Sequence, residues 1–295
     1  MKIVNLRKIL VVLVAGIVLG VIIDWVRFGR LKKNETKLTV IPTVTITIPT
    51  ITAAMIPTKI PVKQLTFDEM NNSFGPCVRV PVLMFHHIQE MKDAKEKHQT
   101  SLTVIPEDFR KDMEYLKTNN YTSISLADLA AFFDQGLALP KKSVAITLDD
   151  AYEDNYSIMW PILKEYGFKA TIFTPTGLVQ NPDYLSWDQI KEMSNSGLVY
   201  FGNHTWSHHG STGSPEVLEK EISLADTQLN EHGENQAKIF AYPYGNPSKS
   251  AESVLQKSGY KMAFTTVSGS TMCKGKRYEL PRIRVGNASL KAYGL

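Results

Sequence analysis

The sequence has few cysteines and a small net charge. It also contains no short internal repeat that would account for its alternation of predicted strands and helices. Cys77 and Cys273 are the only cysteines among 295 residues, so the chain can form at most one intramolecular disulfide, which an oxidising exterior would permit. Basic residues number 33 and acidic residues 29. This small positive excess, part of which lies near the N-terminus, does not argue for nucleic-acid binding.

The first 33 residues contain an apolar run at positions 9–23, preceded by three basic residues and followed by Asp24 and Trp25. Fifteen residues are fewer than the roughly twenty that a membrane span needs, but extension past Trp25 permits a tilted helix with the indole at the interface. No cleavage site of small residues follows directly. We therefore expect residues 1–33 to be an uncleaved membrane anchor, with a cleaved signal peptide and secretion as the alternative.

Residues 34–75 are predicted to be a linker, because threonine, isoleucine and proline dominate the stretch from 36 to 62. Recurrent prolines prevent a regular helix and favour an extended stalk, although β-branched residues also permit an edge strand. From residue 76 to residue 295 the pattern alternates strand and helix. This alternation predicts one α/β domain built on a parallel barrel or a wound sheet.

An acidic pair, Asp149 and Asp150, follows an apolar segment at 143–147 that reads as a buried strand. Catalytic groups gather at the carboxyl ends of strands in α/β folds. Adjacent carboxylates repel each other unless a cation or a proton separates their roles. We therefore expect one of the two to bind a metal and the other to accept protons.

His204 and His208 lie four residues apart, so a helical turn or a tight loop can bring their imidazoles together. With one carboxylate they form a set of two histidines and one aspartate, which leaves positions open for water and substrate, as catalytic zinc sites require. The expected cofactor is a divalent metal, zinc before cobalt or nickel. Together with the acidic pair, these residues predict a metal-dependent hydrolase.

Across residues 80–285 the chain resembles the polysaccharide deacetylase family, whose members carry NodB-type domains. Thr-Leu-Asp-Asp at 147–150, His-Thr-Trp-Ser-His at 204–208 and Phe-Ala-Tyr-Pro-Tyr-Gly at 240–245 correspond to three of its motifs. The resemblance implies a distorted (β/α) barrel of about seven parallel strands.

The same resemblance assigns roles to individual residues. Asp149 would be the general base, and the backbone N–H of Tyr244 would bind the oxyanion. The metal ligands would be Asp150, His204 and His208.

Three positions depart from the commonest family pattern. Ala151 replaces a glycine, and Ala241 stands where many members carry an arginine that orients the base. Arg282 or Arg284 could supply that arginine, and we expect Arg282 to do so. No histidine follows His232, so the usual C-terminal histidine, which supplies the general acid, is missing.

An apolar strand at 80–85 ends in His86 and His87. It resembles the permuted branch of the family, typified by poly-N-acetylglucosamine deacetylases, in which the acid-bearing strand precedes the acidic pair. We assign His86 as the general acid, with His87 as the weaker candidate. Trp187 and Tyr184 are candidates to line a sugar-binding cleft, with a core or surface role as the alternative for each.

The predicted function is removal of acetyl groups from an N-acetylated polysaccharide of the cell envelope or matrix, such as peptidoglycan, poly-N-acetylglucosamine or chitin. The alternatives are an acetylxylan-type O-acetyl esterase, an inactive surface glycan-binding protein and a structural envelope protein that binds metal for stability. Ala151 is the only feature that favours inactivity. A glycan substrate places the domain outside the cytoplasm, and the oligomeric state stays open.

Overall fold

The computed structural model describes residues 65–295, so the predicted membrane segment at 1–33 and most of the predicted linker lie outside the described residues. The described residues belong to one unit, Val62–Leu295. None of the helices within 65–295 is both long enough and apolar enough to cross a membrane.

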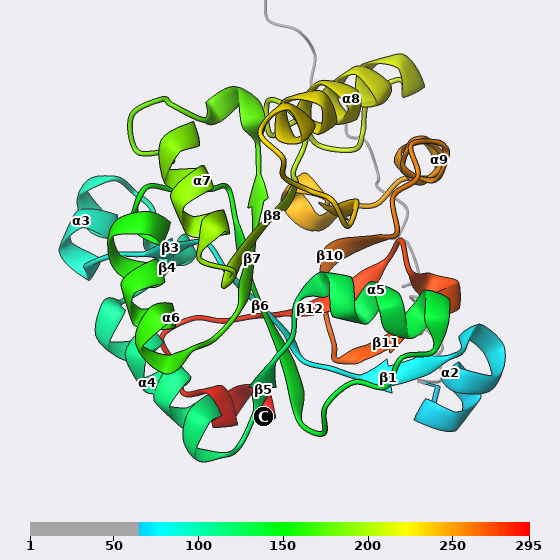
Figure 1. Cartoon of the computed structure of the whole chain (residues 1–295), viewed down its shortest axis with the longest axis horizontal. Coiled ribbons are helices and arrows are strands. Elements are labelled where there is room, and N and C mark those ends of the chain that lie inside the picture. The colour runs from blue at the N-terminus through cyan, green and yellow to red at the C-terminus, as the bar shows by residue number, and fades with distance from the viewer. Residues whose placement is uncertain (1–64) are drawn as a thin grey trace, which may run out of the picture. The chain divides into compact units, whose positions relative to one another are not determined.

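Parallel strands in this part of the chain close into a barrel (Figure 1). In spatial order they are β2 (Val82–Phe85), β12 (Leu280–Arg284), β10 (Met262–Ser268), β9 (Ile239–Ala241), β8 (Val199–Asn203), β7 (Ala170–Thr174) and β6 (Ser143–Asp149). The ring closes because β2 also pairs with β6, and the two-residue β5 (Thr122–Ser123) adds to β6. The predicted barrel of about seven parallel strands is confirmed.

Helices follow or precede the strands around the barrel (Figure 1). They are α4 (Pro106–Thr118), α5 (Leu126–Gln135), α6 (Trp160–Tyr166), α7 (Trp187–Asn195), α8 (Pro215–Glu231) and α9 (Lys249–Lys257). Helix α5 starts where Ser125 and Asp128 form a capping box, as their spacing predicts. Helix α8 buries one face, which carries Leu218, Ile222, Ala225 and Leu229, so helical periodicity fixes which side packs inward.

The barrel interior is filled by side chains. Phe173 of β7 and Phe264 of β10 belong to strands that are not neighbours in the sheet, yet their ring centroids lie 6.0 Å apart. Strand β6 buries all seven of its residues, as expected for a strand covered on both faces. Polar groups at the carboxyl ends of these strands therefore rest on a rigid apolar base.

The end of the predicted linker forms a helix instead. Residues 67–74 are α2 (Phe67–Phe74), which begins at a capping box between Thr66 and Glu69. Thr-x-x-Glu is a sequence signature for a helix start, and the proline content of the preceding stretch obscured it. Helix α2 contacts β1 (Cys77–Arg79) and β11 (Thr271–Cys273).

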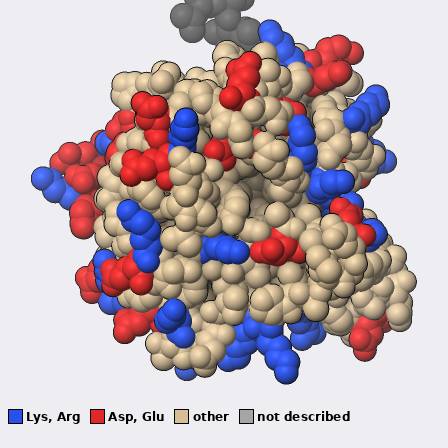
Figure 2. Space-filling model, in the orientation of Figure 1, with Lys and Arg blue, Asp and Glu red and all other residues tan. Residues whose placement is uncertain are grey.

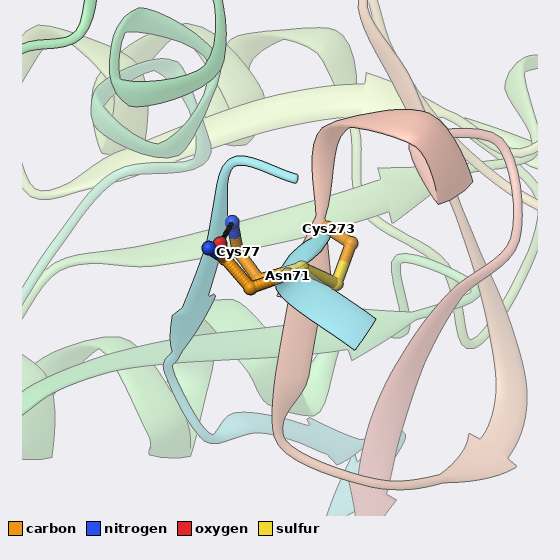
Figure 3. Close-up of a disulfide and its surroundings, with 3 residues drawn as sticks. All are labelled: Asn71, Cys77 and Cys273. Atoms are coloured by element: carbon orange, nitrogen blue, oxygen red, sulfur yellow. Dashed lines mark hydrogen bonds between the residues drawn. A yellow bond between two sulfur atoms is a disulfide. The ribbon is translucent and has the colours of Figure 1, made fainter. Parts of the chain in front are cut away.

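A disulfide joins β1 to β11, which pair antiparallel with Cys77 opposite Cys273 (Figure 3). The Oδ1 atom of Asn71 in α2 accepts a hydrogen bond from the Cys77 N–H, at 2.8 Å. The bridge therefore fastens the start of the domain to the short strand β11, which precedes the last barrel strand in sequence.

Replacing both cysteines by serine should lower the free energy of unfolding by about 2–5 kcal/mol, because the bridge closes a long loop and constrains the unfolded chain. The bridged residues are 196 positions apart. Urea unfolding of the wild type and of C77S/C273S would measure the loss, and wild type in reducing agent should match the variant. Identical midpoints in oxidising buffer would contradict the expectation.

Candidate active site at the carboxyl ends of the strands

Three candidate metal ligands meet at one end of the barrel. Asp150 follows the last residue of β6, and His204 follows the last residue of β8. The Oδ1 atom of Asp150 lies 3.1 Å from Nε2 of His208 and 3.5 Å from Nε2 of His204. Among the described residues, this is the one group of three or more histidine, cysteine or acidic side chains whose ligand atoms gather within 4.8 Å. The structure thus brings together the three residues predicted to bind metal.

A tight loop, not a helical turn, carries the two histidines. Thr205 and His208 both have positive φ, at 66° and 59°. Asn203 accepts a hydrogen bond from the Thr205 N–H at 2.8 Å. The Glu221 carboxylate of α8 accepts hydrogen bonds from the backbone N–H groups of Trp206 and Ser207. The loop conformation is therefore held by side chains at both of its ends.

The protonation of this group suits a divalent cation. Nδ1 of His204 lies 2.8 Å from the Ala241 carbonyl oxygen, which can only accept, so Nδ1 carries the hydrogen and Nε2 is free to coordinate. Burial raises the pKa of Asp150, but His204 and His208 lower it by more, so the net pKa lies well below the ordinary value. Its buried Oδ1 has no hydrogen-bond partner among the described residues. An ionised oxygen facing two imidazole nitrogens fits a metal such as zinc.

Asp149, beside this group, is held by a buried arginine. The Nη1 and Nη2 atoms of Arg282 donate to Oδ1 and Oδ2 of Asp149, both at 2.7 Å. Both side chains are buried. Burial raises the pKa of Asp149, but the charge and the hydrogen bonds of Arg282, together with the nearby His204 and His86, lower it by more, so the net pKa is below the ordinary value. The carboxylate is therefore ionised and fixed in orientation.

The choice between the two arginines is clear in the structure. Besides Asp149, Arg282 donates to the Thr265 carbonyl oxygen at 3.0 Å and to Oγ1 of Thr147 at 3.2 Å. Arg284 instead donates to the carbonyl oxygen of Ser101, at 2.9 Å. Arg282 therefore occupies the orienting position opposite the proposed base.

A cavity of about 330 Å³, called the catalytic cavity below, lies at the predicted site. Its lining residues are His86, Leu102, Asp149, Asp150, Tyr152, His204, His208, Tyr244, Thr266 and Arg284. Burial lowers the pKa of His86 by more than the charges of Asp149 and Asp150 raise it. A histidine with a lowered pKa is neutral at rest and is a strong proton donor once it is charged.

His87, the weaker candidate for the general acid, points elsewhere. Its Nδ1 lies 2.5 Å from Oδ2 of Asp154, and its ring stacks on Tyr152 with centroids 3.5 Å apart. Since His87 does not line the catalytic cavity, the structure separates the two adjacent histidines and leaves His86 as the one that faces the site.

Tyr244 and Ala151 also adopt left-handed backbone. Tyr244 has φ 61° in the 3₁₀ turn Pro243–Gly245, and its exposed ring packs edge-on against His208 with centroids 4.7 Å apart. Ala151 has φ 58° directly after Asp150, whose φ is 78°. Left-handed backbone costs a residue with a Cβ about 1–2 kcal/mol, so glycine suits this position better and alanine is tolerated. Its buried side chain packs in the core.

Trp187 does not line the catalytic cavity. It begins α7 and stacks on His232, with ring centroids 3.9 Å apart and planes 5° from parallel. Tyr152, which the sequence reading passed over, lines the cavity instead. Burial and the nearby Asp150 raise its pKa. Its place two residues after the acidic pair was the available signal.

Comparison with known proteins places this geometry in context. The family model for polysaccharide deacetylases matches residues 137–263. The chain is 30% identical to the Bacillus subtilis protein "Putative polysaccharide deacetylase YxkH" over 208 residues, covering 70% of this chain and 71% of that protein. It is 27% identical to the poly-beta-1,6-N-acetyl-D-glucosamine N-deacetylase of Staphylococcus aureus over 208 residues, covering 66% and 71%.

Two solved structures share the fold. The Streptococcus pyogenes deacetylase PplD in complex with acetate superposes with a TM-score of 0.67 at 28% identity, covering 73% of this chain and 98% of that chain. IcaB from Ammonifex degensii superposes with a TM-score of 0.64 at 22% identity, covering 73% and 94%. The second likeness supports the barrel fold alone.

Proposed function

The chain belongs to the polysaccharide deacetylase family, and we propose that it removes acetyl groups from an N-acetylated polysaccharide of the envelope or matrix in a metal-dependent reaction. The observation that carries the proposal is the composition of the catalytic cavity. It holds a carboxylate paired with a buried arginine, a second carboxylate facing two imidazoles, and a third histidine. Poly-N-acetylglucosamine is the substrate we favour, because a relative at 27% identity carries that activity in its name.

Asp150, His204 and His208 would hold the metal, with zinc the first choice for two imidazoles and one carboxylate. When bound, such a cation supplies Lewis acidity, which polarises an acetyl carbonyl and makes water acidic near neutral pH. Cobalt and nickel suit the same ligands. The rest of the chemistry falls to the side chains around them.

Asp149 accepts the proton of the attacking water. Arg282 keeps Asp149 ionised and turned toward the cavity, so the base is ready before substrate arrives. The backbone N–H of Tyr244 stabilises the oxyanion. His86, in its charged form, donates a proton to the departing nitrogen, and acetate and a free amine result.

Two alternative functions are an O-acetyl esterase and an inactive glycan-binding protein. An O-acetyl esterase would use the same groups, with His86 protonating an alcohol, and the named relatives favour the amide reaction. An inactive glycan-binding protein was favoured only by Ala151. Because Ala151 adopts the conformation that the usual glycine would adopt, it no longer argues for lost activity.

Acetate release by the full chain tests the proposal. We expect release from N-acetylglucosamine oligomers with zinc, its loss on chelation, and its recovery when zinc, cobalt or nickel is restored. H204A and H208A should bind no stoichiometric zinc and release no acetate, since each removes one of three ligands. Release from acetylated xylan alone would favour the esterase, and bound zinc without any release would favour a glycan-binding protein.

The place of action follows from the same proposal. A polysaccharide substrate outside the cytoplasm would require the domain to be outside too, held by the predicted anchor at residues 1–33 or secreted after cleavage. Treatment of intact cells with a protease tests whether the domain is outside the cytoplasm. Detection of the domain in membrane and medium fractions of untreated cells then distinguishes the anchored protein from the secreted one. Protection from protease in intact cells would contradict both.

A further inference from the structure

A second cavity, of about 220 Å³, lies beside the catalytic one and is strongly acidic. Its lining includes residues of α3 (Met91–Glu96) and of the turn after β6. The carboxylates are Asp93, Glu96, Glu153, Asp154 and Asp183, and the one lysine or arginine among the lining residues is Lys97. Asp and Glu side chains gather on the side of the molecule where α3 lies (Figures 1 and 2).

The charge of this acidic cavity is only partly neutralised from within. Lys97 pairs with Asp183 at 2.6 Å. The Asp154 carboxylate lies 2.5 Å from Nδ1 of His87 and accepts a hydrogen bond from the backbone N–H of Ile88 at 3.0 Å. Asp93 and Glu96 are exposed and form no salt bridge within residues 65–295. The cavity therefore attracts a cation.

His87 shows what kind of cation fits. The side chain is 2% exposed, lines the acidic cavity, and has no hydrogen-bond partner for Nε2 among the described residues. Since Nδ1 faces the Asp154 carboxylate, the proton belongs on Nδ1, and Nε2 is left as an acceptor. A ligand that satisfies this atom must donate a hydrogen bond.

A single metal ion suits the acidic cavity poorly. No three of its histidine and carboxylate side chains bring their ligand atoms within 4.8 Å of one another, a spacing that such side chains of residues 65–295 reach only at the catalytic group. Dispersed carboxylates and one buried acceptor suit a ligand that carries a positive charge and several N–H or O–H donors. A primary ammonium on a sugar ring has these properties.

The two cavities are close neighbours. His86 lines the catalytic cavity and His87, the next residue, lines the acidic one. The ring of Tyr152 lines the catalytic cavity and stacks on His87 with centroids 3.5 Å apart. A polymer seated at the first cavity can therefore place a neighbouring unit at the second.

We propose that the acidic cavity binds the ammonium group of a glucosamine unit that has already lost its acetyl group. The next N-acetylated unit of the same polymer then occupies the catalytic cavity. This inference rests on the proposed deacetylase function. Its consequence is that the protein acts faster beside an existing free amine than on a fully acetylated chain.

The test compares kcat/KM for acetate release from an N-acetylglucosamine pentamer and from pentamers that carry one free amine at each position in turn. For wild type, the best amine-bearing pentamer should exceed the acetylated one about three- to tenfold at low salt, and less at high salt. Asp93→Asn with Glu96→Gln should reduce this ratio to within twofold and leave the acetylated pentamer unaffected.

Glu107→Gln with Glu114→Gln is the matched control. It removes two exposed carboxylates from α4, neither of which lines either cavity, and it should keep the wild-type ratio. Equal rates on all pentamers, or an unchanged ratio in the Asp93 and Glu96 variant, would overturn the proposal. Failure of wild type to release acetate from any pentamer would instead count against the deacetylase function itself.

Discussion

Replacing Asp149 by asparagine should lower kcat by about 10²- to 10⁴-fold, the contribution typical of a positioned general base. Asparagine keeps the size of the side chain but cannot accept the proton of the attacking water. Asp149 lies outside the group of three predicted ligands, so zinc content should stay at the wild-type level. The pattern expected is bound metal with little turnover.

Acetate release and metal content, measured on the same preparation, check this result. Asp150→Asn is the informative comparison, because it removes a predicted ligand from the neighbouring position and should lower both quantities. Normal turnover by D149N would show that another group takes the proton. Loss of zinc from D149N would show that the two aspartates share the metal.

A stability control belongs with these measurements. An amide at position 149 turns N–H groups toward the guanidinium of Arg282, whose two donors now meet carboxylate oxygens at 2.7 Å. Some loss of unfolding free energy is therefore expected. Activity should be compared well below the unfolding midpoint of the variant, so that the fall in kcat reports chemistry alone.

The fold was predictable from local patterns because each strand and helix carries its own signal. Strand β6 is an apolar run, and α8 shows helical spacing. Helix α2 was missed although Thr66 and Glu69 form a capping box, because the proline-rich stretch before it favoured a linker. The membrane segment lies outside the described residues and stays a prediction.

The site was predictable at the motifs and less so between them. His86 and His87 are adjacent, and the sequence ranks them without showing which side chain faces the cavity. Arg282 and Arg284 are two apart in β12, so their side chains point to the same side of the strand. Arg282 is buried in the barrel and Arg284 is exposed. This difference depends on how neighbouring strands are staggered, which local sequence patterns do not show. The stacking of Trp187 on His232 was not predictable from local patterns, because the two residues are distant in sequence.

Replacing Arg282 by methionine should lower the free energy of unfolding by about 3–5 kcal/mol, because removing one partner of a buried ion pair leaves the other charge uncompensated. Asp149 would lose both of its charge-assisted hydrogen bonds at once. Turnover should fall as well, since the base loses its orientation. Arg284→Met is the matched control for stability: Arg284 is exposed and donates to a carbonyl oxygen, so its loss should cost under about 1 kcal/mol of unfolding free energy.

The double variant D149L/R282M separates stability from catalysis. Replacing both members of a buried ion pair by apolar side chains is often neutral or stabilising, so urea unfolding should show much of the loss in R282M recovered, while activity stays absent. A cycle of the four proteins gives the coupling between the two side chains. Additive losses, with no recovery in the double variant, would mean that Arg282 acts through its contacts with Thr147 and Thr265 and not through Asp149. Recovery without activity would show that this buried pair is kept for catalysis, because the barrel can be made nearly as stable without it.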